Sequence, residues 1–211
     1  MKVAAFNGSP KKEGNTYQAL RMVCDELENR GIETEIIHVG AKTVAGCTAC
    51  GSCGRNKNEK CIMNDDGVNE WIQVMKKADG ILLGSPVHYS GISATMKAFL
   101  DRAFYVAGGN GGLFRHKVGA GLVAVRRSGG MVAFQQLNQY LLYSEMLIPT
   151  ANYWNVIHGR GPGEVVQDDE GRQIMRVLGK NMAWLLQLVA AGRGVVPEPD
   201  GEPKTYTNFI R

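Results

Sequence analysis

The sequence has no strong excess of charge of one sign and no long apolar run. Its 24 Lys and Arg residues nearly balance its 20 Asp and Glu residues, and the formal net charge of +4 is mild. Nucleic-acid-binding domains usually carry a concentrated basic stripe, which is missing here. No stretch approaches the ~20 apolar residues of a membrane span, and the apolar run after Met1 is too short for a signal peptide. These absences predict a cytoplasmic protein that binds neither nucleic acid nor a membrane.

Several chemical motifs are missing as well. A P-loop places a lysine directly after its second glycine, but here Gly14 is followed by Asn15. The G-x-G-x-x-G dinucleotide fingerprint, the G-x-S-x-G nucleophile elbow and the H-E-x-x-H zinc motif do not occur. These gaps argue against a nucleoside triphosphatase, a classical dinucleotide site and a hydrolase that uses a side-chain nucleophile.

What the chain does contain is a regular alternation of apolar runs and helical patterns. Strands are predicted over 2–6, 34–39, 80–84, 118–125 and 151–157, and helices over 15–30, 68–75, 93–104, 131–146 and 174–189. This alternation predicts an α/β fold, in which a parallel sheet is covered by helices on both faces. One domain is expected over 1–195, followed by a tail over 196–211.

Ligands of such sheets bind at the carboxyl ends of the strands, so the loops after the first, third and fourth predicted strands are candidates. The first loop precedes a helix, whose unpaired N–H groups and partial positive charge suit a phosphate. Glycines there let the backbone come close to a ligand. The residues that we expect to bind one phosphate monoester are Ser9, Lys11, Gly14, Asn15 and Thr16. The alternative is an ordinary β–α turn in which Asn15 is the N-cap.

The loops after the third and fourth predicted strands have the composition expected around a flat heterocycle. Proline fixes the backbone of the first of them, two ring side chains follow, and a glycine precedes the next helix. Its backbone N–H groups could meet the polar edge of the ring, and His88 or Tyr89 could lie beside the ring's face. Ordinary packing of Tyr89 and simple exposure of His88 remain the alternatives. The candidates in these two loops are Pro86, Val87, His88, Tyr89, Ser90, Gly91, Arg126, Ser128 and Gly129.

With both loops considered, the sequence resembles the flavodoxin-like NAD(P)H-dependent FMN reductases. The segment from Gly8 to Thr16 is similar to that family's FMN phosphate loop, and the segment from Ser85 to Arg102 to its second flavin loop and following helix. The resemblance covers roughly the first 150 residues, about one domain. It implies a flavodoxin-like three-layer α/β/α sandwich with a five-stranded parallel sheet in the order 2-1-3-4-5, bound FMN, and NAD(P)H as co-substrate. Related proteins often complete the flavin site with a neighbouring subunit, so a homodimer or homotetramer is expected.

Four of the five cysteines lie close together in the sequence. The C-x-x-C-x-x-C run that begins at Cys47 is followed by Cys61, and its other members are Cys50 and Cys53. Four thiols in one loop can ligate a [4Fe–4S] cluster or zinc, and they can also remain bare thiols. The spacing resembles that of iron–sulfur flavoproteins, a branch with the same fold. We expect this loop to lie close to the flavin or at a contact between subunits.

These observations together predict an oxidoreductase in which FMN performs the chemistry and no side chain acts as a nucleophile. Electrons would pass from NAD(P)H to an acceptor, either a small molecule (quinone, flavin, nitro-aromatic) or a redox protein. Two other functions stay open: an iron–sulfur flavoprotein acting in electron transfer, and a non-catalytic redox sensor. No role is assigned to His38, His116 or His158.

Overall fold

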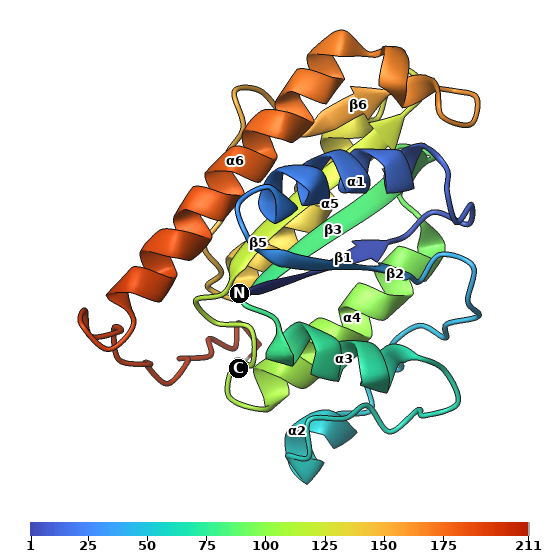
Figure 1. Cartoon of the computed structure of the whole chain (residues 1–211). Helices are drawn as coiled ribbons and strands as arrows, with labels where there is room; N and C mark the ends of the chain where they lie inside the picture. The colour runs from blue at the N-terminus through green and yellow to red at the C-terminus, as the bar shows by residue number, and fades with distance from the viewer. Residues whose placement is uncertain (211) are drawn as a thin grey trace.

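The computed structural model describes residues 1–210, which form one parallel sheet between two layers of helices (Figure 1). The sheet order is β2-β1-β3-β5-β6, and every neighbouring pair in it is parallel. A two-residue strand, β4, pairs antiparallel with the end of β3. The strands are β1 (Lys2–Asn7), β2 (Glu33–His38), β3 (Gly80–His88), β4 (Gly91–Ile92), β5 (Val118–Val125) and β6 (Val156–His158). The predicted five-stranded parallel sheet and its order are therefore confirmed, with β4 as an addition.

Both faces of the sheet are buried, which explains why the strands read as continuous apolar runs rather than as alternating ones. Successive side chains of a strand point to opposite faces. Ala4 and Phe6 of β1 accordingly join one core cluster, and Val3 and Ala5 join the other. The sandwich thus has two cores separated by the sheet.

The helices divide between these two faces. On one face lie α1 (Asn15–Glu28) and α6 (Asp169–Gly192), which pack on each other as well as on the sheet. On the other lie α3 (Val68–Lys77), α4 (Ala94–Gly109) and α5 (Gly130–Tyr143). Two shorter helices, α2 (Ser52–Asn56) and the 3₁₀ helix η1 (Glu164–Gln167), complete the described elements.

Several element boundaries differ from the sequence prediction; α4 continues to Gly109, for example, and α6 begins at Asp169. The third strand does not end at residue 84 but continues to His88, because its last residues pair with β4. The last parallel strand begins at Val156 rather than at residue 151. The helix before it ends at Tyr143 and not at residue 146. The extension of β3 is decided by its pairing with β4 and β5, which a local pattern does not show.

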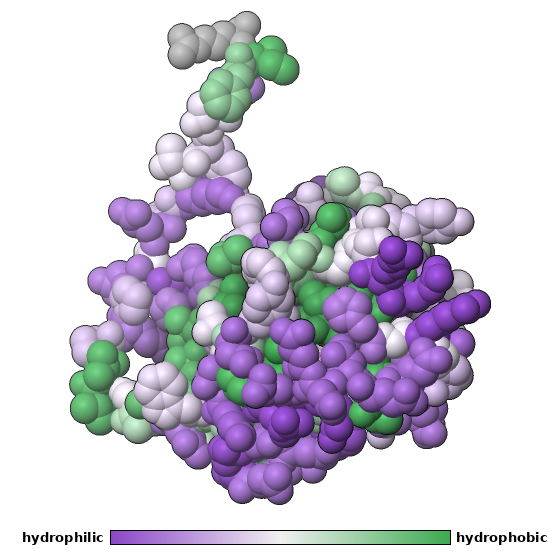
Figure 2. All heavy atoms as spheres, turned by 90° about the horizontal axis from the view of Figure 1, so that it is seen from above, coloured by the Kyte–Doolittle hydropathy of each residue, from purple (hydrophilic) through white to green (hydrophobic). Residues whose placement is uncertain are grey.

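After α6 the described chain has no regular secondary structure. Figure 2 shows its last residues standing clear of the body of the molecule, with hydrophobic side chains near their end. Tyr206, Phe209 and Ile210 there are 82%, 92% and 85% exposed. Among residues 1–210, no helix combines the length and the apolar character needed to cross a membrane.

Candidate functional site

The β1–α1 loop is folded tightly by its own polar side chains. Asn7, at the end of β1, is fully buried; its Nδ2 donates to Lys12 O at 3.0 Å and its Oδ1 accepts from Ser9 N at 3.0 Å. Ser9 is buried too, and its Oγ accepts from Lys11 N at 3.1 Å. The hydroxyl oxygen of Ser9 therefore helps to shape the loop. The side chain of Lys11 lies exposed on the outer side of the loop.

Neighbouring elements fix this loop in place. Gly8 N donates to Gly84 O of β3 at 2.8 Å, and the hydroxyl of Ser93 donates to Gly8 O at 2.6 Å. On the other side, His38 Nε2 donates to Ser9 O at 2.7 Å. The loop is therefore held from β2, β3 and the start of α4 together, which gives it a rigid shape before any ligand arrives.

The amino end of α1 lacks a side-chain cap. Its N-cap is Gly14, so the alternative in which Asn15 caps the helix is wrong. Asn15 lies in the first turn instead, where its Nδ2 donates to Gly161 O at 2.9 Å and its buried Oδ1 has no partner among the described residues. Thr16 follows and is almost fully buried. An uncapped helix start with a partial positive charge is the feature that binds anions in many proteins.

The second predicted loop is a β-hairpin between β3 and β4. Val87 pairs with Ile92 and His88 with Gly91, which leaves Tyr89 and Ser90 as a two-residue turn. Both turn residues have positive φ, 48° and 62°, as in a type I′ turn. Tyrosine rarely adopts this conformation, and its side chain here is completely exposed. Backbone strain of this kind is often found at ligand sites.

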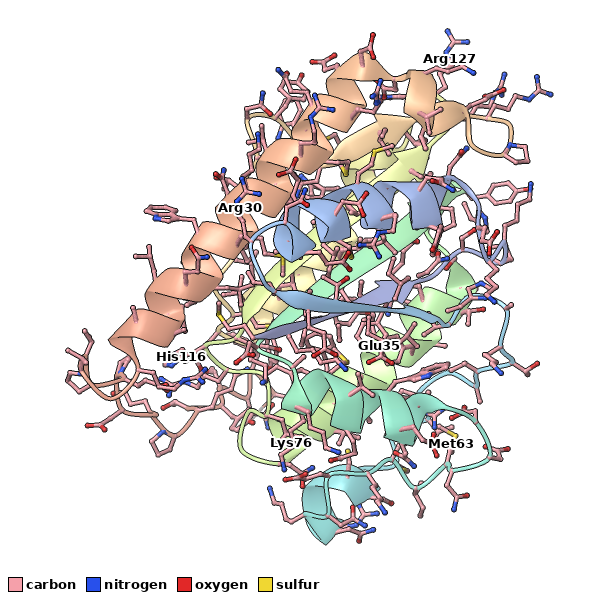
Figure 3. All side chains as sticks on the ribbon, in the orientation of Figure 1. Arg30, Glu35, Met63, Lys76, His116 and Arg127 are labelled. Carbon is pink, nitrogen blue, oxygen red and sulfur yellow. The ribbon has the colours of Figure 1, made fainter. Side chains whose placement is uncertain are left out.

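The third predicted loop, after β5, touches this hairpin. Gly129 has a φ of 87°, and a Cβ at this position would lie 2.8 Å from Ser90 Cα and 3.1 Å from Val87 Cγ1. Only glycine permits such a close approach. Arg126, Arg127 and Ser128 are exposed, and Arg127 projects from the upper edge of the molecule (Figure 3).

The predicted site residues thus come from three loops at the carboxyl ends of β1, β3 and β5. The hairpin contacts the loop after β5 at Gly129, and the β1–α1 loop contacts β3 and α4 through Gly8. Sequence reasoning missed Asn7 and His38, and it missed the segment around Gly161 that lies over Asn15. For Asn7 a local signal existed, a polar residue directly before Gly8. For Gly161 there was none, because its partner lies 146 positions away.

The cysteine loop is organised by one buried arginine of α4. Arg102 is 1% exposed, and its guanidinium donates to Cys61 Sγ at 3.3 Å and to Ala45 O at 3.3 Å. It also donates to Met63 O at 2.7 Å and forms an ion pair with Asp66. Two carbonyls, one thiol and one carboxylate of the loop therefore converge on a single side chain.

The four thiols do not converge in this way. Cys50 is exposed, whereas Cys47, Cys53 and Cys61 are half-buried. Within residues 1–210, no three Cys, His, Asp or Glu side chains are grouped so that they could hold a metal ion. The ligand set of the predicted cluster therefore stays a prediction. Hydrogen bonds from Ser52 hold the pKa of the Cys50 thiol below its usual range, while burial raises the pKa of the Cys24 thiol to about 11.

The cysteine loop runs from the β1–α1 loop toward the carboxyl half of α4. It starts beside the β1–α1 loop, where Gly40 lies against Ser9 O. Farther along, Cys53 Sγ lies 3.8 Å from Tyr105 O in the carboxyl half of α4. Twelve helical residues, about 18 Å, separate that level from Ser93 at the amino end of α4. Figure 1 accordingly shows α2 at the lower end of the molecule, away from the β1–α1 loop. The expectation that the cysteine loop lies close to the flavin or at a contact between subunits stays a prediction.

The sheet order, the uncapped helix after β1 and the paired loops after β3 and β5 define a flavodoxin-like α/β sandwich. Residues 1–161 match the model of the family described as NADPH-dependent FMN reductase. This chain belongs to that family.

Relatives and solved structures agree with this assignment. An iron–sulfur flavoprotein of Methanocaldococcus jannaschii is 37% identical over 196 residues, covering 90% of this chain and 99% of the relative. One from Methanosarcina thermophila is 29% identical, over 92% of this chain and 99% of the relative. A WrbA-like flavodoxin from Agrobacterium tumefaciens superposes with a TM-score of 0.61 at 14% identity, over 89% of this chain and 97% of that one. An archaeal flavodoxin gives 0.59 at 16% identity, with 89% and 99% coverage. At such low identity the two structures show the fold alone.

Proposed function

We propose that this chain binds FMN and passes electrons from NAD(P)H to a separate acceptor. The observation that carries the proposal is the amino end of α1, which has no side-chain cap and follows directly on a rigid polar loop. A free helix start can take one phosphate monoester through its N–H groups. The flavin, when bound, would supply the hydride chemistry, and the chain would supply binding and orientation.

The residues present fit FMN in a second respect. Asn15 Oδ1 is a buried acceptor without a partner among the described residues, beside the proposed phosphate position. A buried acceptor normally has a donor, and the ribityl chain of FMN carries hydroxyl groups that can donate. The exposed backbone of the hairpin turn at Tyr89 and Ser90 would then face the ring, with the loop at Gly129 beside it.

The cofactor itself provides the test. Purified protein should be yellow, and heating should release a compound with the mass of FMN. Reduction of the bound flavin should follow addition of NADH or NADPH under anaerobic conditions. Release of FAD alone, or of no flavin after incubation with excess FMN, would contradict the proposal.

A second function, electron transfer through an iron–sulfur cluster, is favoured by the donor set of Cys47, Cys50, Cys53 and Cys61 and by the loop's attachment to Arg102. Relatives carry the name iron–sulfur flavoprotein. Anaerobic purification should then give brown protein with about four iron atoms per chain, as a [4Fe–4S] cluster requires. Replacement of Cys50 and Cys53 by serine should remove the iron and leave FMN in place. Iron-free protein after anaerobic reconstitution would contradict this second function.

A further inference from the structure

A loop after β6 lies over the start of α1, although the sequence pattern gave it no role. This β6–η1 loop (residues 159–163) meets the first turn of α1 at Asn15. Gly161 O accepts from Asn15 Nδ2 at 2.9 Å, and a Cβ at Gly159 would lie 3.0 Å from the same nitrogen. The loop therefore encloses the amide nitrogen of Asn15 and forms a further wall of the proposed FMN site.

The contact with Gly161 fixes which end of the Asn15 amide meets the loop. A backbone carbonyl only accepts hydrogen bonds, so the NH₂ end of the amide must face it. The oxygen end is then left for another partner; it is buried and has no donor among residues 1–210. A lone acceptor repels the oxygens of a phosphate and suits a hydroxyl. The Asn15 side chain is thus set to bind the ribityl chain of FMN rather than its phosphate.

Glu164 closes this loop onto itself. Its Oε2 accepts from Arg160 N at 2.6 Å, and a Cβ at Gly161 would lie 2.7 Å from its Oε1. Hydrogen bonds from the backbone of Gly161 and Arg160 hold the pKa of the Glu164 carboxyl below its usual range. An ionised carboxylate accepts such hydrogen bonds more strongly than a neutral group does. Glu164 thereby fixes the backbone at Gly161, whose carbonyl holds Asn15.

The two ends of the loop are held independently of the Glu164 side chain. Gly159 N donates to a carbonyl of β5 at 2.9 Å, and His158 N donates to Asp168 Oδ2 at 2.7 Å. At the other end Val165 is fully buried, whereas Glu164 itself is exposed. Loss of the Glu164 carboxylate should therefore loosen only the middle of the loop and leave β6 and η1 in place.

We propose that Glu164 is a positioning residue for flavin binding. Through Gly161 O it holds the Asn15 side chain in the orientation that accepts a hydrogen bond from the ribityl 4′-hydroxyl, the hydroxyl nearest to the phosphate along the FMN chain. The inference rests on the proposed function, because it requires the FMN phosphate at the amino end of α1. It deepens that function by assigning the recognition of the sugar alcohol to a loop that belongs to none of the three flavin loops.

The test compares the binding of FMN with that of 4′-deoxy-FMN, each titrated into apoprotein and followed by flavin fluorescence. Wild type should bind FMN about fivefold more tightly, as one ordinary hydrogen bond allows. Glu164→Ala should lose this preference and keep the wild-type affinity for 4′-deoxy-FMN. Asn15→Ala should lose the preference too, and adding Glu164→Ala to it should change nothing further, because both residues act through one contact. Glu170→Ala is the matched control, since this second exposed glutamate accepts no hydrogen bond from the residues described.

Each contrary result has a distinct meaning. A wild-type preference for FMN that persists in Glu164→Ala would overturn the inference. So would an equal loss of affinity for both flavins, since Glu164 would then support the site as a whole. A further loss on adding Glu164→Ala to Asn15→Ala would show that the loop reaches the ligand by another route, such as Arg160, and would also overturn it. Wild type that binds both flavins equally would refute the inference alone, whereas wild type that binds neither would refute the proposed function.

Discussion

At the scale of single residues, the side chains in the first turn of α1 allow the most direct test of FMN binding. Asn15→Ala combined with Thr16→Ala should lower FMN affinity by tenfold or more. The double variant removes the Asn15 Oδ1 acceptor for a ribityl hydroxyl and the Thr16 hydroxyl donor for the phosphate, and a hydrogen bond to a charged group is worth roughly 1.5–3 kcal/mol. Titration of the apoprotein with FMN, followed by flavin fluorescence, measures the change. Asn29→Ala, at the other end of the same helix, is the control and should bind FMN as wild type does. Unchanged affinity in the double variant would mean that the phosphate binds elsewhere.

Two cysteines should differ sharply in reactivity. Cys50 is exposed, and hydrogen bonds from Ser52 favour its thiolate, which is the reactive form. Arg55 Nη2 donates to Ser52 Oγ at 3.1 Å, which leaves the hydroxyl proton of Ser52 free for this role. In metal-free protein, iodoacetamide near neutral pH should label Cys50 first and leave buried Cys24 unlabelled, as read by peptide mass spectrometry. Ser52→Ala should slow the labelling of Cys50, and an equal rate would contradict the assigned cause.

The residues of the candidate site could be predicted where the sequence pattern that marks them lies within a few neighbouring positions. The segment from Gly8 to Thr16 carries its glycines, short polar side chains and helix start within a few positions, so the loop was found from the sequence. His38 and Gly161 could not be found, because each acts through a backbone contact formed only when β2 or β6 is in place.

At the scale of elements, the β3–β4 turn combines an unfavourable backbone with two ill-suited residues. Type I′ turns favour Asn-Gly, so Tyr89→Asn with Ser90→Gly should raise the free energy of unfolding by about 1–2 kcal/mol, as relief of positive-φ strain allows. The same variant should bind FMN more weakly if the strain serves the flavin. Urea unfolding and FMN titration measure the two effects. A variant that is both more stable and equally tight in FMN binding would show that the turn's sequence has no role in the site.

Arg102 of α4 holds the cysteine loop in its folded position. Arg102→Met removes one partner of a buried ion pair and leaves Asp66 uncompensated, so the free energy of unfolding should fall by about 3–5 kcal/mol. Arg30→Met is the control, since Arg30 pairs with Glu26 on the helix surface and such pairs contribute about 0.5 kcal/mol. Urea denaturation compares the two variants. Equal losses would refute the organising role of Arg102.

Two of the elements that sequence analysis missed, α2 and β4, share a physical cause. α2 contains Cys53, Gly54 and Arg55 and has no apolar periodicity; it is held through contacts with α4, such as that of Gly54 with Gly109. β4 is two residues long and depends on the pairing of Ile92 with Val87. Long amphipathic helices and buried strands carry their pattern in the sequence, whereas these short elements are specified by their neighbours.

At the scale of the whole molecule, the C-terminal segment contacts the body of the protein as far as Lys204 and then projects away from it. Glu198 pairs with His116 at 3.1 Å, and Lys204 Nζ lies 4.2 Å from the ring centroid of Tyr143. Beyond Lys204 the apolar side chains of Tyr206, Phe209 and Ile210 project outward. Apolar residues at a terminus are normally ordered by docking on something, and we expect that to be a second copy of this chain.

Deletion of 205–211 should therefore reduce a homodimer or homotetramer to smaller species, with FMN binding retained or weakened. Sedimentation at micromolar concentration reads the mass, against 23.0 kDa for one chain. Replacing Asn208 alone, a polar residue of the same segment, should leave the assembly intact and is the control. Full-length protein that sediments as a single chain would contradict the expected assembly.

Two glycines flank the cysteine loop, and their contacts bear on how the loop can be gained or lost during evolution. A side chain at Gly40 would lie 2.1 Å from Ser9 O, and one at Gly67 would lie 2.7 Å from the ring of Trp71. Both ends are thus fixed to the sandwich, and the chain between them can be shortened without displacing either end. A descendant that lost the loop, Asp66 included, would have to exchange Arg102 for an apolar side chain as well, or it would be left with a buried, unpaired cation. The loop and residue 102 should therefore be inherited together, as a module that can be gained or discarded while the rest of the fold is conserved.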